Sequence, residues 1–225
     1  MGDQVFGSPP GSAGDIAFLD AIINYDVYGS MGATGYAGQS KVDAHYAAQA
    51  GWKSLADGVG TVYVPAVAPG FNDKGVRSGN APVSRKLTQN DAFGTLFQAM
   101  LQGAKTLADP EIGHMILVTS WNEWHEDTQI EPVKVAPPTS VDDSATGNYY
   151  TDSLAYEGYG TRYLDILREE TFPNLADAIL VLKVVCGLDV SGEDDPIGAD
   201  VNGDGKIGLA KVIFLLQHIA GSRTE

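Results

Sequence analysis

The sequence predicts an α/β domain followed by a small all-α domain. Strand-like and helix-like runs alternate over residues 17–170, glycine- and proline-rich segments follow the strands, and an apolar helix is repeated within residues 174–221. Strands that alternate with helices are typical of parallel sheets, and two apolar helices need each other to cover their apolar faces. We therefore expect two domains, residues 1–172 and residues 173–225.

The strands of the first domain are expected in short runs rich in β-branched and aliphatic residues, the composition of strands buried on both faces. These runs are residues 17–28, 61–67 and 115–119. Helices are expected where apolar residues have helical spacing, in residues 41–56, 91–107 and 161–170. Residues 133–158 are polar and are expected to be irregular. The segments 29–38 and 69–82 follow strands, where functional loops lie in parallel folds.

The composition limits the classes of partner. The chain has 225 residues, 44% of them hydrophobic, and its 29 acidic and 14 basic residues give a formal charge of −15. This charge repels nucleic acid and anionic membranes, and no apolar run approaches the roughly 20 residues that cross a membrane. A neutral polysaccharide or a metal cation is the more natural partner. No signal peptide is expected, because the start at Met1 lacks a basic segment and a long apolar stretch.

Two carboxylates, Glu123 and Glu126, lie among aromatic residues directly after the apolar run of residues 115–118. Reactive groups sit at the ends of strands in a parallel barrel, and two carboxyl groups held close there can divide acid and base roles. The neighbouring indoles of Trp121 and Trp124 can stack on the apolar face of a sugar ring. The arrangement predicts carbohydrate chemistry, with a solvated acidic turn as the alternative.

Residues 122–131 resemble the signature of glycoside hydrolase family 99, the family of endo-α-mannosidases and endo-α-mannanases, and depart from it once, with Asp127 in place of glycine. Residues 69–77, from Pro69 to Arg77, are similar to a second segment of that family. The resemblance implies a (β/α)₈ (TIM) barrel, which usually needs about 250 residues. We therefore expect a partial barrel, the C-terminal half only, in a truncated product or an excised fragment, with a smaller self-contained variant as the alternative.

The resemblance also implies a reaction, the hydrolysis of α-mannosides of the endo-α-1,2-mannosidase or mannanase type through a 1,2-anhydro sugar, without a catalytic cofactor. Glu123 would be the base that takes the proton of the substrate 2-hydroxyl. Glu126 would protonate the leaving oxygen and then activate water. Asp127 adds a third negative charge beside Glu126 and a Cβ where glycine can hold a positive φ. The expected substrate contacts are Tyr25, Asp26, Tyr28, Arg77, Trp121, Asn122, Trp124 and His125. Packing is an equal alternative for the first three, and a salt bridge within the loop is the alternative for Arg77.

The second domain contains a repeat, in which residues 175–182 align with residues 209–216. Both copies predict apolar helices that end at a glycine, which suits the position after a helix. The expected core of the helix pair is Ile179, Leu182, Ile213 and Leu216. The single cysteine, Cys186, is expected to be a buried small hydrophobic residue.

Between the two copies lies the first half of a calcium loop of EF-hand type. The expected ligands are the side chains of Asp200, Asn202 and Asp204 and the carbonyl of Lys206. Loop and repeat together resemble a type I dockerin, which implies a structural calcium ion and a cohesin-type scaffold as partner. Position 12 of the loop carries Lys211 instead of an acid, so we expect weak calcium binding, with a plain turn as the alternative.

Three classes of function remain open. The first is a glycosidase that is weakly active or inactive as a fragment. The second is a non-catalytic, dockerin-bearing product that binds a cohesin-like partner. The third is a family 99-like protein of polysaccharide biosynthesis, which the dockerin-like tail disfavours. For the full-length protein the resemblance implies an extracellular or cell-surface location of the bacterial secreted type.

Overall fold

The computed structural model describes residues 2–3, 9–141, 150–171, 175–188 and 208–220. The chain divides into two compact units, Met1–Leu167 and Arg168–Glu225, each described here by itself. The domain boundary expected after residue 172 stays a prediction. The expected calcium ligands Asp200, Asn202, Asp204 and Lys206 lie outside the described residues.

Five strands of the first unit pair in parallel, as the alternation of strands and helices predicted. One sheet has the order β1 (Gly2–Asp3), β2 (Ala21–Ile23), β3 (Val62–Val64), and a second pairs β4 (Ala66–Val67) with β5 (Leu117–Val118). The run expected as one strand, residues 61–67, is divided at Pro65, which has no N–H to donate to a ladder. Its carbonyl still accepts a hydrogen bond from the Leu117 N–H at 2.9 Å. The two parallel sheets agree with the α/β class, and the partial barrel stays a prediction.

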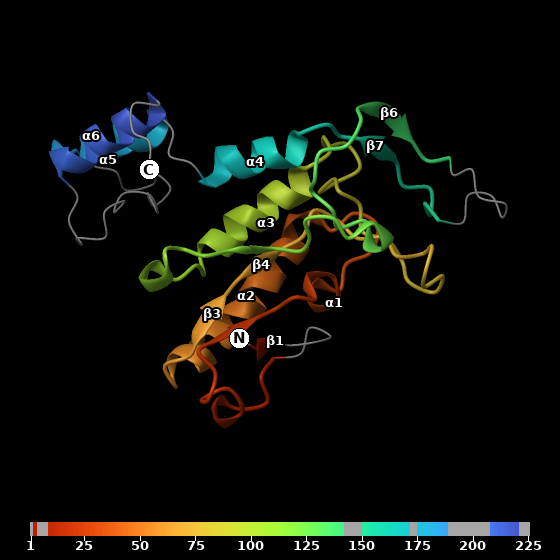
Figure 1. The fold of residues 1–225 in the computed structure, drawn as a ribbon, viewed down its shortest axis with the longest axis horizontal. Helices are drawn as coiled ribbons and strands as arrows, with labels where there is room; N and C mark the ends of the chain where they lie inside the picture. Colours follow the sequence, from red (N-terminus) through yellow and green to blue (C-terminus); the bar gives the residue numbers. More distant parts are fainter. Residues whose placement is uncertain (1, 4–8, 142–149, 172–174, 189–207, 221–225) are drawn as a thin grey trace. The chain divides into compact units, whose positions relative to one another are not determined.

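Two long helices, α2 (Gly38–Asp57) and α3 (Thr95–Lys105), lie side by side against these strands (Figure 1). The Tyr46 hydroxyl of α2 donates to the carbonyl of Ala66 at 3.1 Å. A Cβ on Gly103 would lie 2.2 Å from the Tyr46 ring, so this glycine allows α3 to approach α2 closely. Both helices were predicted, but α3 begins later than residue 91 because Gly94 has a φ of 91°.

The fourth helix of the unit, α4 (Arg162–Thr171), agrees with the prediction for residues 161–170. Its Tyr163 is fully buried and packs edge-on against Phe97 of α3 and against Tyr159, with ring centroids 5.6 and 4.6 Å apart. Within the described residues, short 3₁₀ helices form at Ala13–Asp15, Pro110–Ile112 and Trp124–Glu126.

Two segments of the first unit differ from the sequence-based expectation. The run 17–28 ends in a short helix, α1 (Val27–Met31), because the Asp26 carboxylate caps it by accepting a hydrogen bond from the Gly29 N–H at 2.8 Å. Residues expected to be irregular contain an antiparallel pair, β6 (Ala136–Thr139) with β7 (Tyr156–Gly158). The sequence did not predict β6 because this strand contains two prolines, and proline is tolerated in a strand only where no ladder donor is needed.

The second unit contains the two predicted helices, α5 (Leu175–Val185) and α6 (Leu209–Ile219), which pack on each other. The expected core was wrong: Ile179, Leu182, Ile213 and Leu216 are 42–48% exposed. The side chains buried between the helices are Ala178, Val181, Val212 and Leu215. Both helices have apolar residues on more than one face, so the sequence did not determine which face is covered.

Two further side chains of the second unit have unexpected exposure. Cys186 is exposed, not buried, because it follows the end of α5. Lys211 is only 2% exposed although its head is charged. Among the helices that the structure describes, none combines the length and the apolar composition needed to cross a membrane.

Candidate active site

The loops that follow β2, β4 and β5 leave the sheets at one edge. Thr119, directly after β5, donates its hydroxyl to the carbonyl of Tyr25 after β2, at 3.3 Å. The Thr119 N–H donates to the carbonyl of Val67 in β4, at 2.8 Å. The carboxyl ends of parallel strands are where substrate-binding loops of such folds gather. This edge therefore collects the two segments that the sequence singled out, residues 69–77 and 122–131.

The loop of residues 119–132 is closed on itself by hydrogen bonds. The Ser120 hydroxyl lies 2.9 Å from the Thr128 hydroxyl and also accepts from the Glu123 N–H at 2.9 Å. The Glu123 carboxylate caps the 3₁₀ helix by accepting from the His125 N–H at 3.1 Å, and it lies 3.4 Å from Nδ1 of His125. The side chain of Glu123 is 42% exposed, so the proposed base is open to solvent.

The proposed acid, Glu126, contacts the second family segment. Its Oε1 accepts from Nη1 of Arg77 at 3.2 Å, and its carbonyl accepts from the Asn72 N–H at 2.7 Å. The same Nη1 donates to the fully buried carboxylate of Asp73 at 2.7 Å. The hydrogen bonds to Asp73 and then to Glu126 raise the pKa of Arg77. Arg77 was predicted as a substrate contact, and the structure places it between the proposed acid and a buried carboxylate.

Asp127, the departure from the family signature, has a positive φ of 48°. Its carboxylate accepts from Nη2 of Arg85 at 3.0 Å and from Nε at 3.3 Å. The third negative charge beside Glu126 is therefore paired with a guanidinium. Arg85 was missed by sequence reasoning; the only signal for it was an extra acid at residue 127 that needed a cation.

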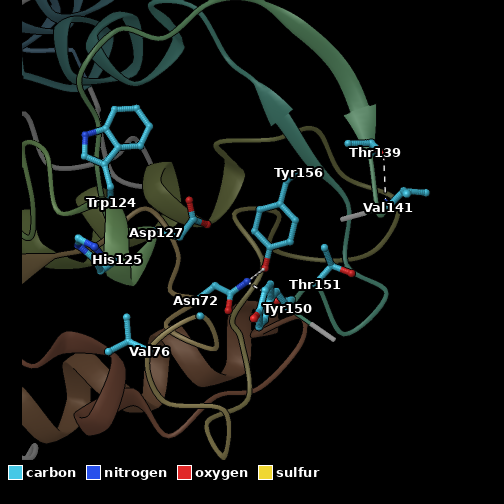
Figure 2. Close-up of a pocket in the computed structure, with 11 residues that line it drawn as sticks. Asn72, Val76, Trp124, His125, Asp127, Thr139, Val141, Tyr150, Thr151 and Tyr156 are labelled. Atoms are coloured by element: carbon cyan, nitrogen blue, oxygen red, sulfur yellow. Dashed lines mark hydrogen bonds between the residues drawn. The ribbon is translucent and has the colours of Figure 1, made fainter. Parts of the chain in front are cut away.

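A cavity of about 420 Å³ adjoins this loop (Figure 2). Trp124 and His125 stand on one side of it, and Tyr156 stands across from them. The Asn72 side-chain amide donates to the Tyr156 hydroxyl and to the carbonyl of Tyr150, both at 2.7 Å. Burial, followed by the charge of Asp127, raises the pKa of Tyr156. Glu123 and Glu126 do not line this cavity, which begins at the residues between and after them.

Tyrosines 150 and 156 were not predicted as site residues. They belong to the segment that was expected to be irregular, and the pairing of β6 with β7 and the hydrogen bonds from Asn72 place this segment beside the loop. Of the predicted aromatic contacts, Trp121 and Trp124 are 53% and 55% exposed, which leaves both indoles accessible. Asn122 is also exposed, and its carbonyl accepts from the Trp124 N–H at 3.1 Å.

Of the predicted contacts after β2, Tyr28 packs against a neighbouring ring and Asp26 caps a helix. Tyr28 stacks on Phe71 with ring centroids 3.8 Å apart and donates its hydroxyl to the carbonyl of Ala81 at 2.9 Å. Burial, and then the charges of Asp73 and Asp26, raise the pKa of Tyr28. Asp26 caps α1, and Tyr25 is 48% exposed at the edge where the loops meet. Their contacts with substrate stay predictions.

A metal centre is not formed by the residues described here. Within them, no three His, Cys, Asp or Glu side chains are grouped so that they could hold a metal ion.

Residues 15–159 match the family model described as Glycosyl hydrolase family 99. The chain belongs to this family of glycosidases. It is 34% identical over 116 residues to the glycoprotein endo-alpha-1,2-mannosidase-like protein of Mus musculus, covering 52% of this chain and 22% of the mouse protein. It is 38% identical over 79 residues to the Homo sapiens protein of the same name, covering 35% and 16%. The chain thus spans about a fifth of the length of these curated relatives.

A solved structure similar to this chain is the GH99 endo-alpha-mannosidase from Bacteroides thetaiotaomicron. It is 21% identical with a TM-score of 0.42, and the match covers 75% of this chain and 44% of that one.

Proposed function

We propose that this chain supplies the catalytic carboxylates of an endo-acting α-mannoside hydrolase. The observation that carries the proposal is the contact between the two family segments, in which Glu126 of the loop meets Arg77 and Asn72 at the shared edge of the sheets. The family match and the names of the mannosidase relatives support the substrate class.

In the proposed reaction Glu123 removes the proton from the substrate 2-hydroxyl. The resulting oxygen attacks the anomeric carbon as the bond to the leaving oxygen breaks, and Glu126 gives that oxygen its proton. A 1,2-anhydro sugar forms. Glu126 then takes a proton from water, which opens the anhydro ring at the anomeric carbon, and Glu123 returns its proton to the 2-oxygen. Each carboxyl group ends in its starting protonation state, as acid–base catalysis requires.

The surroundings of the loop support an extended glycan as substrate. Indoles offer flat apolar faces to sugar rings, and both Trp121 and Trp124 are half exposed. The cavity beside Trp124 has about 420 Å³, within the range of roughly 300–1,000 Å³ for small-molecule sites. An endo-acting enzyme needs room for sugar units on both sides of the cleaved bond, and this cavity is the space we assign to one of them.

Hydrolysis of a fluorogenic α-mannobioside by the purified chain tests the proposal. The described strands form two small parallel sheets and one antiparallel pair, so we expect slow turnover from the 225-residue chain alone. Glu123→Gln and Glu126→Gln should each lower the rate at least about 100-fold, since each removes a proton-transfer group. Glu131→Gln, a matched change within the same signature, should leave the rate nearly unchanged.

Two outcomes would contradict this account. Turnover that survives both Glu123→Gln and Glu126→Gln would remove the assignment of the carboxylates. Fast turnover by the wild-type chain would remove the idea that further barrel strands are needed.

A second role is proposed for the tail, because α5 and α6 leave a row of equivalent apolar side chains exposed. These are Leu175, Ile179, Leu182, Leu209, Ile213 and Leu216. Their pairwise correspondence in the repeat supports a dockerin-like module with a cohesin-type partner. With this module we also propose one weak structural calcium ion at Asp200, Asn202, Asp204 and Lys206, and an extracellular full-length protein. Calorimetric titration of the chain with a cohesin domain in calcium tests this role, and the absence of heat would contradict it.

A further inference from the structure

Arg85 lies outside the loop of residues 119–132 in the sequence and binds this loop through several hydrogen bonds. Its Nη2 donates to three acceptors: the Asp127 carboxylate at 3.0 Å, the Asp127 carbonyl at 2.9 Å and the Gln129 carbonyl at 3.0 Å. Its Nε adds a contact of 3.3 Å to the same carboxylate. Forked, charge-assisted pairs of this kind fix geometry as well as contributing energy. One guanidinium thus binds the loop at the residues immediately after Glu126.

The position of Arg85 is itself determined by its surroundings. The residue is only 5% exposed, and its guanidinium carbon lies 5.1 Å from the centre of the Tyr159 ring and 4.8 Å from that of Tyr163. A Cβ on Gly70 would lie 2.7 Å from Cγ of Arg85, so the glycine of the second family segment, residues 69–77, makes room for the arginine stem. Burial lowers the pKa of Arg85, but the interactions with Asp127 and Tyr163 together outweigh burial, so the pKa is raised. The buried cation therefore depends on the carboxylate of Asp127.

Hydrogen bonds connect the loop residues that Arg85 binds to the two exposed tryptophans, Trp121 and Trp124. The Asp127 N–H donates to the carbonyl of Trp124 at 3.4 Å, and the Ile130 N–H, next to Gln129, donates to the carbonyl of Trp121 at 3.0 Å. Displacement of residues 127–129 would therefore move both indoles and, with them, the carboxylates of Glu123 and Glu126.

We infer that Arg85 is a positioning residue for the catalytic loop and that Asp127, where the family signature has glycine, is its required partner in this chain. Asp127 occupies a left-handed conformation that glycine adopts without strain, and in exchange it supplies the carboxylate that the buried guanidinium needs. The statement that this loop is catalytic rests on the proposed function, whereas the coupling of Arg85 to Asp127 does not.

The test uses the three tryptophans as separate reporters in the ¹⁵N spectrum of the chain. Trp121 and Trp124 report on the loop, and Trp52, 3% exposed in α2, reports on the core. Arg85→Met should shift or broaden the indole signals of Trp121 and Trp124 and leave that of Trp52 in place. Lys86→Met is the matched control, since Lys86 contacts Gln89 and Phe93, and it should move none of the three.

The partner is tested with Asp127→Asn, which tolerates the left-handed conformation and removes only the charge. In the otherwise wild-type chain it should lower the urea midpoint of unfolding, because a buried cation loses its partner. Added to Arg85→Met it should raise the midpoint, because an unpaired carboxylate is removed. If Asp127→Asn shifts the urea midpoint in the same direction in both backgrounds, the pairing of Arg85 with Asp127 is overturned. If the indole signals of Trp121 and Trp124 do not move in Arg85→Met, the positioning role is overturned.

Arg85→Lys is the second variant if Arg85→Met loses all three indole signals, which means that the core has unfolded. It keeps the charge and loses the forked donors, so the signals of Trp121 and Trp124 should move with Trp52 in place; no movement would overturn the role. Under α-mannoside turnover, Arg85→Lys should lower kcat roughly 100-fold with little change in KM, since a misplaced catalytic group costs about that much. Absence of mannosidase activity in the wild-type chain would contradict the proposed function. The indole and urea measurements would still test the coupling of Arg85 to Asp127.

Discussion

The loop of residues 119–132 and the helix pair α5–α6 are stabilised in different ways. The loop receives hydrogen bonds and ion pairs from distant residues, among them Arg85, Arg77 and Asn72. The helix pair has a small apolar core of Ala178, Val181, Val212 and Leu215. The loop should therefore respond to changes of charge that preserve shape, whereas the helices should respond to changes of side-chain volume at those few positions.

The largest effect is expected in the second unit, from two adjacent leucines. Leu215 is fully buried and Leu216 is 44% exposed. Leu215→Ala should destabilise the unit by about 2–5 kcal/mol, because it removes buried contacts and leaves a cavity. Leu216→Ala is the matched control and should cost less than about 1 kcal/mol. The loss of helix signal in urea, followed by circular dichroism, measures both; equal effects would show that the buried face is assigned incorrectly.

An effect of similar size is expected from pH in the first unit. His45 of α2 is 4% exposed, its Nδ1 lies 3.3 Å from the Ser30 hydroxyl oxygen, and burial lowers its pKa from 6.5 to about 4. Between these values the unfolded chain binds a proton that the folded chain does not. Stability therefore falls as the pH decreases from 6.5 to 4, by up to about 3 kcal/mol.

Urea unfolding of unit 1 at several pH values checks this contribution. His45→Gln should flatten the dependence of the urea midpoint between pH 6.5 and 4. His114→Asn, at an exposed histidine with a positive φ that asparagine tolerates, should preserve it. A dependence that survives in His45→Gln would assign the effect to other groups.

The smallest effect is expected at the calcium loop. Calcium normally takes six to eight oxygen ligands, and Lys211 occupies the position where such loops carry a bidentate acid. Lys211→Glu should strengthen calcium binding, although the change also alters a side chain that is only 2% exposed. Isothermal calorimetry measures the affinity. Tight binding by the unmodified chain, with no gain from the variant, would refute the role assigned to position 12.

The sequence alone was sufficient for the elements with a strong local pattern. Helical spacing predicted α2, α3 and α4, short apolar runs predicted the parallel strands β2 to β5 but not β1, and the repeat predicted α5 and α6. It also singled out Glu123 and Glu126 as candidates, because their selection depends on residue types within one short segment, and their catalytic roles stay predictions.

Only the tertiary structure decided what surrounds these elements. It brought Arg77 to Glu126 and Arg85 to Asp127 across more than 40 positions of the chain, and it placed Tyr156 opposite Trp124 through an antiparallel strand pair. It also chose the covered face of the tail helices, burying Leu215 and exposing Leu216. The physical reason is the same in each case: periodicity records local preferences, whereas partners for a charge or an apolar face are supplied by segments that meet only when the chain folds.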